Sequence, residues 1–174
     1  MVEYQRKDRY DINDLRDIMS ILRSPQGCPW DREQIHKSIR NDFIEEVYEA
    51  IEAIDLEDTE LLKEELGDVL LQIIFHCRIE EEKSCFDFDD ICDELCKKLI
   101  IRHPHVFGDI TVSDSGEVLK NWDSIKKETK GQTSYTETLT SVAKSLPALM
   151  RAQKVGKRAM RAGMDFSCVS DAVE

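Results

Sequence analysis

The segment EELGDVLLQIIFH, residues 64–76, constrains the fold of this chain more than any other. Its polar residues Glu65, Asp68, Gln72 and His76 recur at i, i+3, i+7 and i+11, which places them in one narrow stripe along an α-helix. The other faces of that helix are apolar. A helix that is apolar nearly all round is packed on most sides, and buried carboxylates need a partner or a metal ion. The segment therefore predicts a helical bundle with an acidic site inside it.

A second acidic group, EEVYE, contributes Glu45, Glu46 and Glu49. With 36 acidic residues in 174, this pattern arises by chance about once in such a chain, so it is weak evidence alone. It gains weight from the carboxylates of the first segment, because a short hairpin brings the two groups face to face. Carboxylate oxygens without a thiolate suit Mg²⁺ or Mn²⁺, so we expect a metal site rather than a structural network of acids.

Helical periodicity recurs along the chain without strand-like alternation, and the fold class that we expect is all-α. The core should be four-helix-bundle-like, with antiparallel helices and additional C-terminal helices. We expect helices over residues 11–23, 30–55, 60–83, 88–101, 114–130 and 147–163, and a flexible linker at GQTSYTET, residues 131–138. Two domains are predicted: a catalytic helical domain at residues 1–130, then a linker and basic C-terminal helix at residues 131–174. The pattern of the last residues, SDAVE, is that of a new helix start, so we expect the chain to be one segment of a longer protein.

Charge and composition limit the classes of fold and of binding partner that we expect for this chain. A hydrophobic share of 41% with only 7% aromatic residues fits a Leu/Ile-rich helical protein rather than a β-sandwich. The formal charge of −12, from 24 basic and 36 acidic residues, repels nucleic acid and anionic membranes, so neither is expected as a partner. With no secretory signal pattern and no apolar run of bilayer length, a soluble cytoplasmic protein is expected.

Four basic and aromatic residues are candidate nucleotide contacts. Lys98 and Arg102 are four apart on one helix, and so are Trp122 and Lys126 on the next. An indole can stack on a nucleobase while an ammonium group meets a phosphate. A core tryptophan covered by lysine side chains fits the spacing of Trp122 and Lys126 equally well.

Other patterns leave two interpretations open. His103 and His105 flank Pro104 and either fix a turn or contact a ligand. The last helix carries a basic stripe that is either a solvated or acid-contacting face or a phosphate site: Arg151, Lys154, Arg158 and Arg161. The six cysteines are interpreted as reduced thiols, against a zinc site drawing on Cys92, Cys96, His103 and His105. A di-iron site is disfavoured because Glu33-Gln-Ile-His36 is the single Glu-x-x-His match.

Seven blocks occur in the order CPWDREQIH, EEVYEAIEAI, EELGDVLLQIIFH, FDFDDI, RHPHVFGD, NWDSIKKE and SLPALMRAQKV. Over about residues 12–166 the sequence resembles the MazG-type nucleoside triphosphate pyrophosphohydrolases. The resemblance implies an all-α bundle, a homodimer, dependence on Mg²⁺ and hydrolysis of a nucleoside triphosphate to the monophosphate and pyrophosphate. It assigns Glu46, Glu49, Glu65 and Asp68 to the metal, Glu45 to an adjacent ligand or base (catalytic with Glu46), and Lys98, Arg102, Trp122 and Lys126 to the substrate.

Two other functions compete with this expectation. A regulatory helical module would bind nucleotide without turnover, although no metal carboxylate is missing here. A purely structural interaction domain would not need acids on a buried stripe. For the homodimer, apolar surface at Leu70, Ile74 and Phe75 is expected to need cover.

Overall fold

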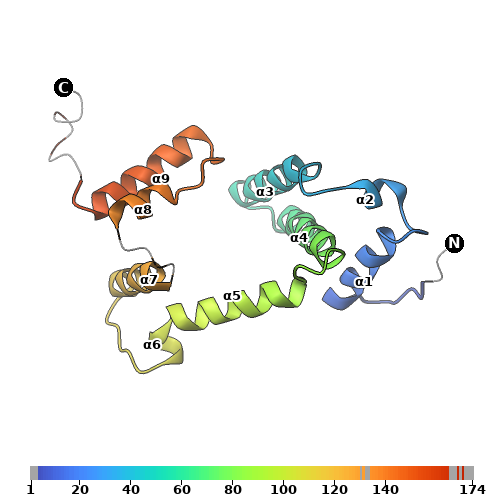
Figure 1. Cartoon of the computed structure of the whole chain (residues 1–174), viewed down its shortest axis with the longest axis horizontal. Coiled ribbons are helices and arrows are strands. Elements are labelled where there is room, and N and C mark those ends of the chain that lie inside the picture. Colours follow the sequence, from blue (N-terminus) through green and yellow to red (C-terminus); the bar gives the residue numbers. More distant parts are fainter. Residues whose placement is uncertain (1–3, 130, 132–133, 165–167, 169, 171–174) are drawn as a thin grey trace. The chain divides into compact units, whose positions relative to one another are not determined.

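The computed structural model describes residues 4–129, 131, 134–164, 168 and 170 (Figure 1). All regular structure in these residues is helical, which confirms the expected all-α class. The elements are α1 (Ile12–Leu22), α2 (Pro29–Glu33), α3 (Arg40–Asp55), α4 (Thr59–Glu81), α5 (Phe88–Arg102), α6 (Pro104–Phe107), α7 (Ser115–Thr129), α8 (Tyr135–Thr140) and α9 (Ala148–Arg161). None of the described helices is long and apolar enough to cross a membrane.

The chain divides into two compact units, Met1–Leu95 and Cys96–Glu174, and α5 contributes residues to both. The predicted domain boundary near residue 130, the four-helix-bundle-like core and the dimer stay predictions.

In the first unit, α3 and α4 form an antiparallel pair (Figure 1). Three residues join them. Glu57 takes a left-handed backbone conformation with φ 55°, and the carboxylate of Asp58 then caps α4 by accepting from the backbone N–H groups of Glu60 and Leu61. This tight connection fixes the register in which the EEVYE segment faces the first half of α4.

The hydrophobic core of this unit lies at the other end of α4. Met19, Ile39, Ile74, Phe75 and Ile79 are each at most 4% exposed and form one cluster. Leu15, Leu70, Leu71 and Phe88 pack around them. The expectation that Leu70, Ile74 and Phe75 would need cover from a partner is therefore wrong, because α1 and the segment before α3 already cover them.

The single helix predicted over residues 30–55 is broken. The backbone of Gln34 is extended (ψ 142°), and Ser38 closes a turn by accepting a hydrogen bond from the Ile35 N–H at 2.9 Å. The break lets Ile39 enter the core and turns His36 toward α4. Burial of Ile39 and the contacts of His36 with His76 and Glu80 outweigh the helical periodicity of the segment.

The helical pattern of residues 43–54 predicts an apolar stripe of Phe43, Val47, Ala50, Ile51 and Ile54 on α3, and this prediction is wrong in part. Val47, Ile51 and Ile54 are exposed, whereas Ala50 and Ala53 are buried. Small side chains permit closer approach of α3 to α4 than branched ones would. Val47, Ile51 and Ile54 consequently face away from α4, whereas Phe43 contacts the His76 ring.

In the second unit, local capping groups set the helix limits. The Asp114 carboxylate accepts from the Glu117 N–H at 2.8 Å where α7 begins, and Gly163 with φ 76° follows the end of α9, as expected. The predicted linker is wrong over residues 135–138, which lie in α8. A capping box between Ser134 and Glu137 starts this helix.

Helices α8 and α9 pack against each other, seen in orange and red in Figure 1. Val142, which follows α8, is 2% exposed. Arg158 of α9 donates to the Thr138 carbonyl oxygen and, at 2.8 Å, to the hydroxyl oxygen of Ser141. Part of the basic stripe of α9 therefore stabilises the end of α8.

Candidate metal centre and substrate contacts

Three carboxylates from α3 and α4 converge in the first unit. One carboxylate oxygen from each of Glu46, Glu49 and Glu65 lies within 4.8 Å of the other two. Asp68, one turn after Glu65, is close enough that its charge acts on both Glu46 and Glu65. We call these four residues the acidic cluster. It arises because Glu46 and Glu49 share one face of α3, Glu65 and Asp68 share one face of α4, and the hairpin sets those faces together.

Crowding of like charges perturbs the cluster. Burial raises the pKa of Glu46, with the charges of Asp68 and Glu49 as the next causes. Burial likewise raises the pKa of Glu65, followed by the charges of Glu49 and Asp68. Ionised carboxylates this close destabilise one another unless a cation lies between them. Oxygens on opposite sides of a Mg²⁺ ion lie about 4.2 Å apart, so small side-chain rotations suffice to bring these oxygens onto one ion.

The cluster is less buried than its sequence context indicates. Glu46, Glu65 and Asp68 are half-buried and Glu49 is exposed, so the expectation of fully buried carboxylates is wrong. The first half of α4 lacks cover on several sides, and Leu66 is 52% exposed. Glu45 is exposed and lies outside the group of converging oxygens. A site this open admits a hydrophilic ligand from solvent.

A second polar group continues along the same face of α4. His76 Nδ1 lies 2.7 Å from His36 Nδ1, the two rings stack at 5.0 Å, and His36 Nε2 bonds to Glu80. Hydrogen bonds from Lys83, at 2.7 Å, and from His36 hold the pKa of Glu80 at about 2. Sequence reasoning placed His76 on the stripe but missed its pairing with His36. The polar stripe of α4 continues to Glu80, one turn after His76. That spacing was the sequence signal that His76 and Glu80 could share a polar partner.

In the second unit, three of the predicted substrate residues come together. The Arg102 guanidinium carbon lies 5.3 Å from the centre of the Trp122 ring system, and Lys126 Nζ lies 4.5 Å from it. Both are cation–π contacts. Lys98, one turn before Arg102, is exposed. Trp122 is half-buried rather than a core residue, and Arg102 and Lys126 cover its indole, so the expectation of a core tryptophan covered by lysines is met only in part. The substrate role of these residues stays a prediction.

The two histidines around Pro104 have partly structural contacts. His103 Nδ1 bonds to the Leu99 carbonyl oxygen at 2.6 Å, which satisfies a carbonyl near the end of α5. The His103 and His105 rings lie 5.7 Å apart. The six cysteines are free thiols, as expected.

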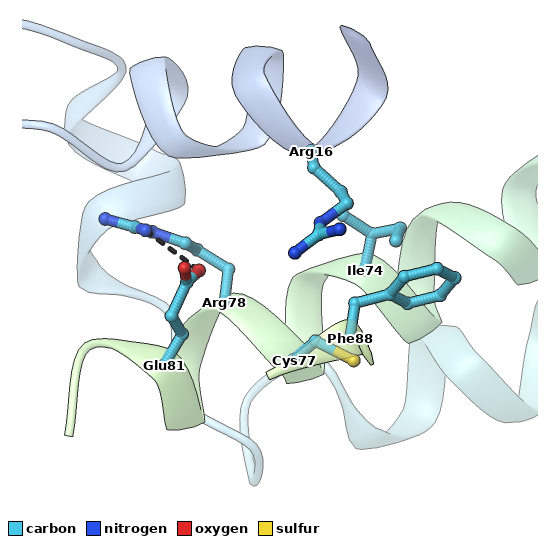
Figure 2. Close-up of a pocket in the computed structure, with 6 residues that line it drawn as sticks. All are labelled: Arg16, Ile74, Cys77, Arg78, Glu81 and Phe88. Atoms are coloured by element: carbon cyan, nitrogen blue, oxygen red, sulfur yellow. Dashed lines mark hydrogen bonds and ion pairs between the residues drawn. The ribbon is translucent and has the colours of Figure 1, made fainter. Parts of the chain in front are cut away.

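Small cavities lie on the opposite face of α4 from the acidic cluster. Figure 2 shows one of about 10 Å³, room for about one water molecule, with Arg16, Arg78 and Phe88 among its walls. A neighbouring cavity of about 160 Å³ shares Arg16 and Arg78. Arg16 pairs with Asp89 and Arg78 with Glu81, so both cations are already neutralised. These cavities therefore lack the uncompensated charge that a phosphate site needs.

Comparison with known proteins agrees with this geometry. Residues 34–107, which contain the whole acidic cluster, match the MazG nucleotide pyrophosphohydrolase domain. This chain carries a MazG domain. The match starts at the histidine-bearing loop before α3 and ends with α6, so it also includes Lys98 and Arg102 but not Trp122 and Lys126.

Relatives and a solved structure extend the similarity beyond the MazG domain. The chain is 44% identical over 164 residues to a nucleoside triphosphate pyrophosphohydrolase of Escherichia coli, covering 94% of this chain and 62% of that protein. It is 44% identical over 155 residues to a nucleoside triphosphate pyrophosphohydrolase/pyrophosphatase MazG of Thermotoga maritima, covering 89% and 59%. It is 48% identical over 148 residues to the uncharacterized protein YabN of Bacillus subtilis, covering 85% and 30%.

The chain thus spans less than two thirds of the length of these relatives. The crystal structure of a MazG-related protein from Thermotoga maritima superposes with a TM-score of 0.56 at 25% identity, covering 67% of this chain and 99% of that one. The helical fold of the MazG domain is therefore shared with a solved structure.

Proposed function

We propose that this chain hydrolyses nucleoside triphosphates to the monophosphate and pyrophosphate, using Mg²⁺, or Mn²⁺ in its place. The observation that carries the proposal is the convergence of Glu46, Glu49 and Glu65 within 4.8 Å, with Asp68 beside them. The names of the E. coli and T. maritima relatives support the reaction. The donor set fits the ion, because Mg²⁺ prefers carboxylate oxygens and several waters.

In this proposal the acidic cluster holds the cation, and Glu45 is an adjacent ligand or base. When bound, the ion supplies positive charge against the phosphates and lowers the pKa of a coordinated water. The residues of the cluster contribute negative charge that is poorly compensated without the ion, which favours its binding. The openness of the cluster gives a triphosphate access.

Substrate contacts are proposed for Lys98, Arg102, Trp122 and Lys126. Arg102 and Lys126 already place their charges over the Trp122 indole. Phosphate oxygens are strong acceptors for both kinds of cation, and the indole offers a surface for stacking. Arg102→Ala should therefore lower kcat/KM by about tenfold, because it removes a charged hydrogen bond to the substrate. The free energy of unfolding should fall by no more than about 1 kcal/mol, the size of the cation–π contact with Trp122.

The partner that we propose is a second copy of this chain. Ile44, Val47, Tyr48, Ile51 and Ile54 form one exposed stripe on α3. A continuous apolar stripe of this kind on a soluble domain is typical of an interface. Light scattering should give about twice the chain mass of 20.1 kDa, and Ile51→Glu should return it to the monomer. An unsubstituted chain that scatters as a monomer contradicts the dimer.

The decisive experiment for the reaction separates the products formed from each NTP and dNTP with Mg²⁺, distinguishing pyrophosphate from orthophosphate. Glu49→Gln and Asp68→Asn should each reduce turnover by more than about 100-fold. Removing an outer-shell partner of a metal costs up to about 100-fold, and removing a direct ligand should cost more. Glu52→Gln makes the same chemical change at an exposed position of α3 and should leave turnover intact.

Retention of near-normal turnover in both cluster variants, with unchanged circular dichroism, would overturn the metal assignment. The alternative function, a nucleotide-binding regulatory module, predicts a different result. In that case nucleotide binds in the presence of Mg²⁺ but no product appears in any incubation.

A further inference from the structure

Gln72 lies in the middle of the polar face of α4 with an unsatisfied hydrogen-bonding atom. The residue is 8% exposed, and its amide oxygen Oε1 has no hydrogen-bond partner within the described part of the chain. Burying an acceptor without a donor is unfavourable, and buried polar atoms in native proteins are nearly always paired. A donor that binds in the functioning protein would resolve this.

The position of Gln72 indicates where that donor lies. Asp68 precedes it by one helical turn and His76 follows by one turn on the same face. Asp68 acts electrostatically on Glu46, and the His76 ring contacts Phe43 at 5.6 Å, so this face of α4 packs along α3. Helical side chains lean toward the N-terminus of their helix, which directs Gln72 toward Asp68 and the acidic cluster.

Neither neighbour supplies a donor. Ionised carboxylates only accept hydrogen bonds, so the acidic cluster cannot satisfy Oε1. Nδ1 of His76 already lies 2.7 Å from His36 Nδ1. A group bound by the acidic cluster that carries a hydrogen-bond donor would satisfy Oε1.

We propose that Gln72 is a positioning residue of the metal site: its Oε1 accepts a hydrogen bond from a water in the hydration shell of the divalent cation held by the acidic cluster. This inference rests on the proposed metal-dependent function. Mg²⁺ dehydrates reluctantly and keeps several waters, each of which donates more strongly than bulk water. Outer-shell partners of this kind orient what the ion binds and tune its affinity.

The test is calorimetric titration of the full chain with Mn²⁺ in the absence of nucleotide, together with thermal unfolding of the metal-free protein. Gln72→Leu removes the acceptor and should weaken Mn²⁺ binding by about tenfold. Its metal-free thermal midpoint should stay the same or rise, because the unpaired buried acceptor is gone. Gln72→Glu keeps an acceptor and should bind Mn²⁺ at least as tightly as the unsubstituted chain.

Gln153→Leu, at an exposed position of α9, is the matched control and should alter neither quantity. Three results would overturn the inference. In the first, Gln72→Leu binds Mn²⁺ as tightly as the unsubstituted chain. In the second, its metal-free midpoint falls, which identifies a structural water or a packing role. In the third, only the affinity for a non-hydrolysable nucleotide changes, which identifies a nucleotide hydroxyl as the donor. The proposed function fails separately, in the first titration, if the unsubstituted chain does not bind Mn²⁺.

Discussion

Arg23 supports the loop between α1 and α2 through a buried ion pair, and its removal is the sharpest test of how this unit is stabilised. Its side chain is 5% exposed. Nε and one terminal nitrogen donate to the Glu82 carboxylate, both at 2.9 Å. The other terminal nitrogen donates to the carbonyl oxygens of Asp31 at 2.6 Å and Gln34 at 3.1 Å. One guanidinium thus joins α4 to the end of α2.

Arg23→Met keeps most of the aliphatic volume, removes all four hydrogen bonds and leaves Glu82 without its main partner. Removing one member of a buried ion pair costs about 3–5 kcal/mol. Glu82 is 32% exposed and keeps a 3.2 Å contact with Arg78, so the lower end applies, about 3 kcal/mol. With an m-value of about 2–3 kcal/mol/M, the urea midpoint should fall by about 1–1.5 M.

The chain provides a matched control. Arg16 makes the same two-bond contact to Asp89, at 2.9 and 3.1 Å, but Asp89 is 71% exposed. Solvent screens such a pair, so Arg16→Met should cost less than about 1 kcal/mol. Urea unfolding followed by circular dichroism measures both variants. If both variants lost the same free energy of unfolding, burial would not be what sets the contribution of an arginine–carboxylate pair to stability.

The pH dependence of the Arg23 effect provides an independent check. The hydrogen bond from Arg23 lowers the pKa of Glu82. A lowered folded-state pKa contributes stability above the ordinary glutamate value, and this contribution is lost as pH falls through the folded pKa. The stability difference between the unsubstituted chain and Arg23→Met should therefore narrow as pH falls below about 4.5.

Further predictions concern the acidic cluster, the α1–α2 loop and the substrate contacts. The raised pKa values of Glu46 and Glu65 mean that the folded state holds protons which the unfolded state has released, so metal-free stability should fall as pH rises above the ordinary glutamate value. Thermal unfolding in EDTA measures this slope, and saturating Mg²⁺ should remove it. Gly27→Ala places a Cβ within 2.1 and 2.3 Å of two carbonyl oxygens of the last turn of α1, and should cost at least about 2 kcal/mol in urea unfolding. Gly67→Ala in α4 meets no atom within 4 Å and should instead stabilise by about 0.5–1 kcal/mol. Lys126→Ala should lower kcat/KM by about tenfold while costing at most about 1 kcal/mol of stability, the size of its contact with Trp122.

Helices with strong local end signals were predictable from sequence. The caps at Asp58, Asp114 and Gly163 place helix limits within one or two residues of those expected. The break at Gln34 was not predictable in this way, because it depends on Ile39 entering a core formed with residues distant in sequence. The α8 helix had a local signal, Ser134 with Glu137, which its polar, glycine-led context obscured.

The candidate site was predictable to the extent that it depends on helical spacing. Glu46, Glu49 and Glu65 meet because i, i+3 positions and a short hairpin suffice to bring them together. The exposure of these carboxylates was not predictable, since it depends on which face of α3 packs on α4. Ala50 and Ala53 are buried on that face, whereas Ile51 and Ile54 are exposed. The pairing of His36 with His76 was missed because His36 lies in the loop before α3, where helical periodicity carries no information.

The distribution of stabilising contacts along α4 indicates that the metal binding proposed above would be coupled to folding. The second half of α4 contributes Ile74, Phe75 and Ile79 to the core, and Glu82, just beyond its end, binds Arg23. The first half carries like charges whose pKa values show mutual repulsion and partial desolvation. Packing of the hydrophobic core at the other end of α4 therefore holds the carboxylates of α3 and α4 close together, although their charges repel one another. The proposed cation would neutralise them and would stabilise the folded state according to its affinity, because the unfolded chain offers no such site. Loss of the Arg23 contact should thus lower the stability of the domain, whereas loss of a cluster carboxylate should remove the stabilisation by metal and relieve the repulsion in the metal-free protein.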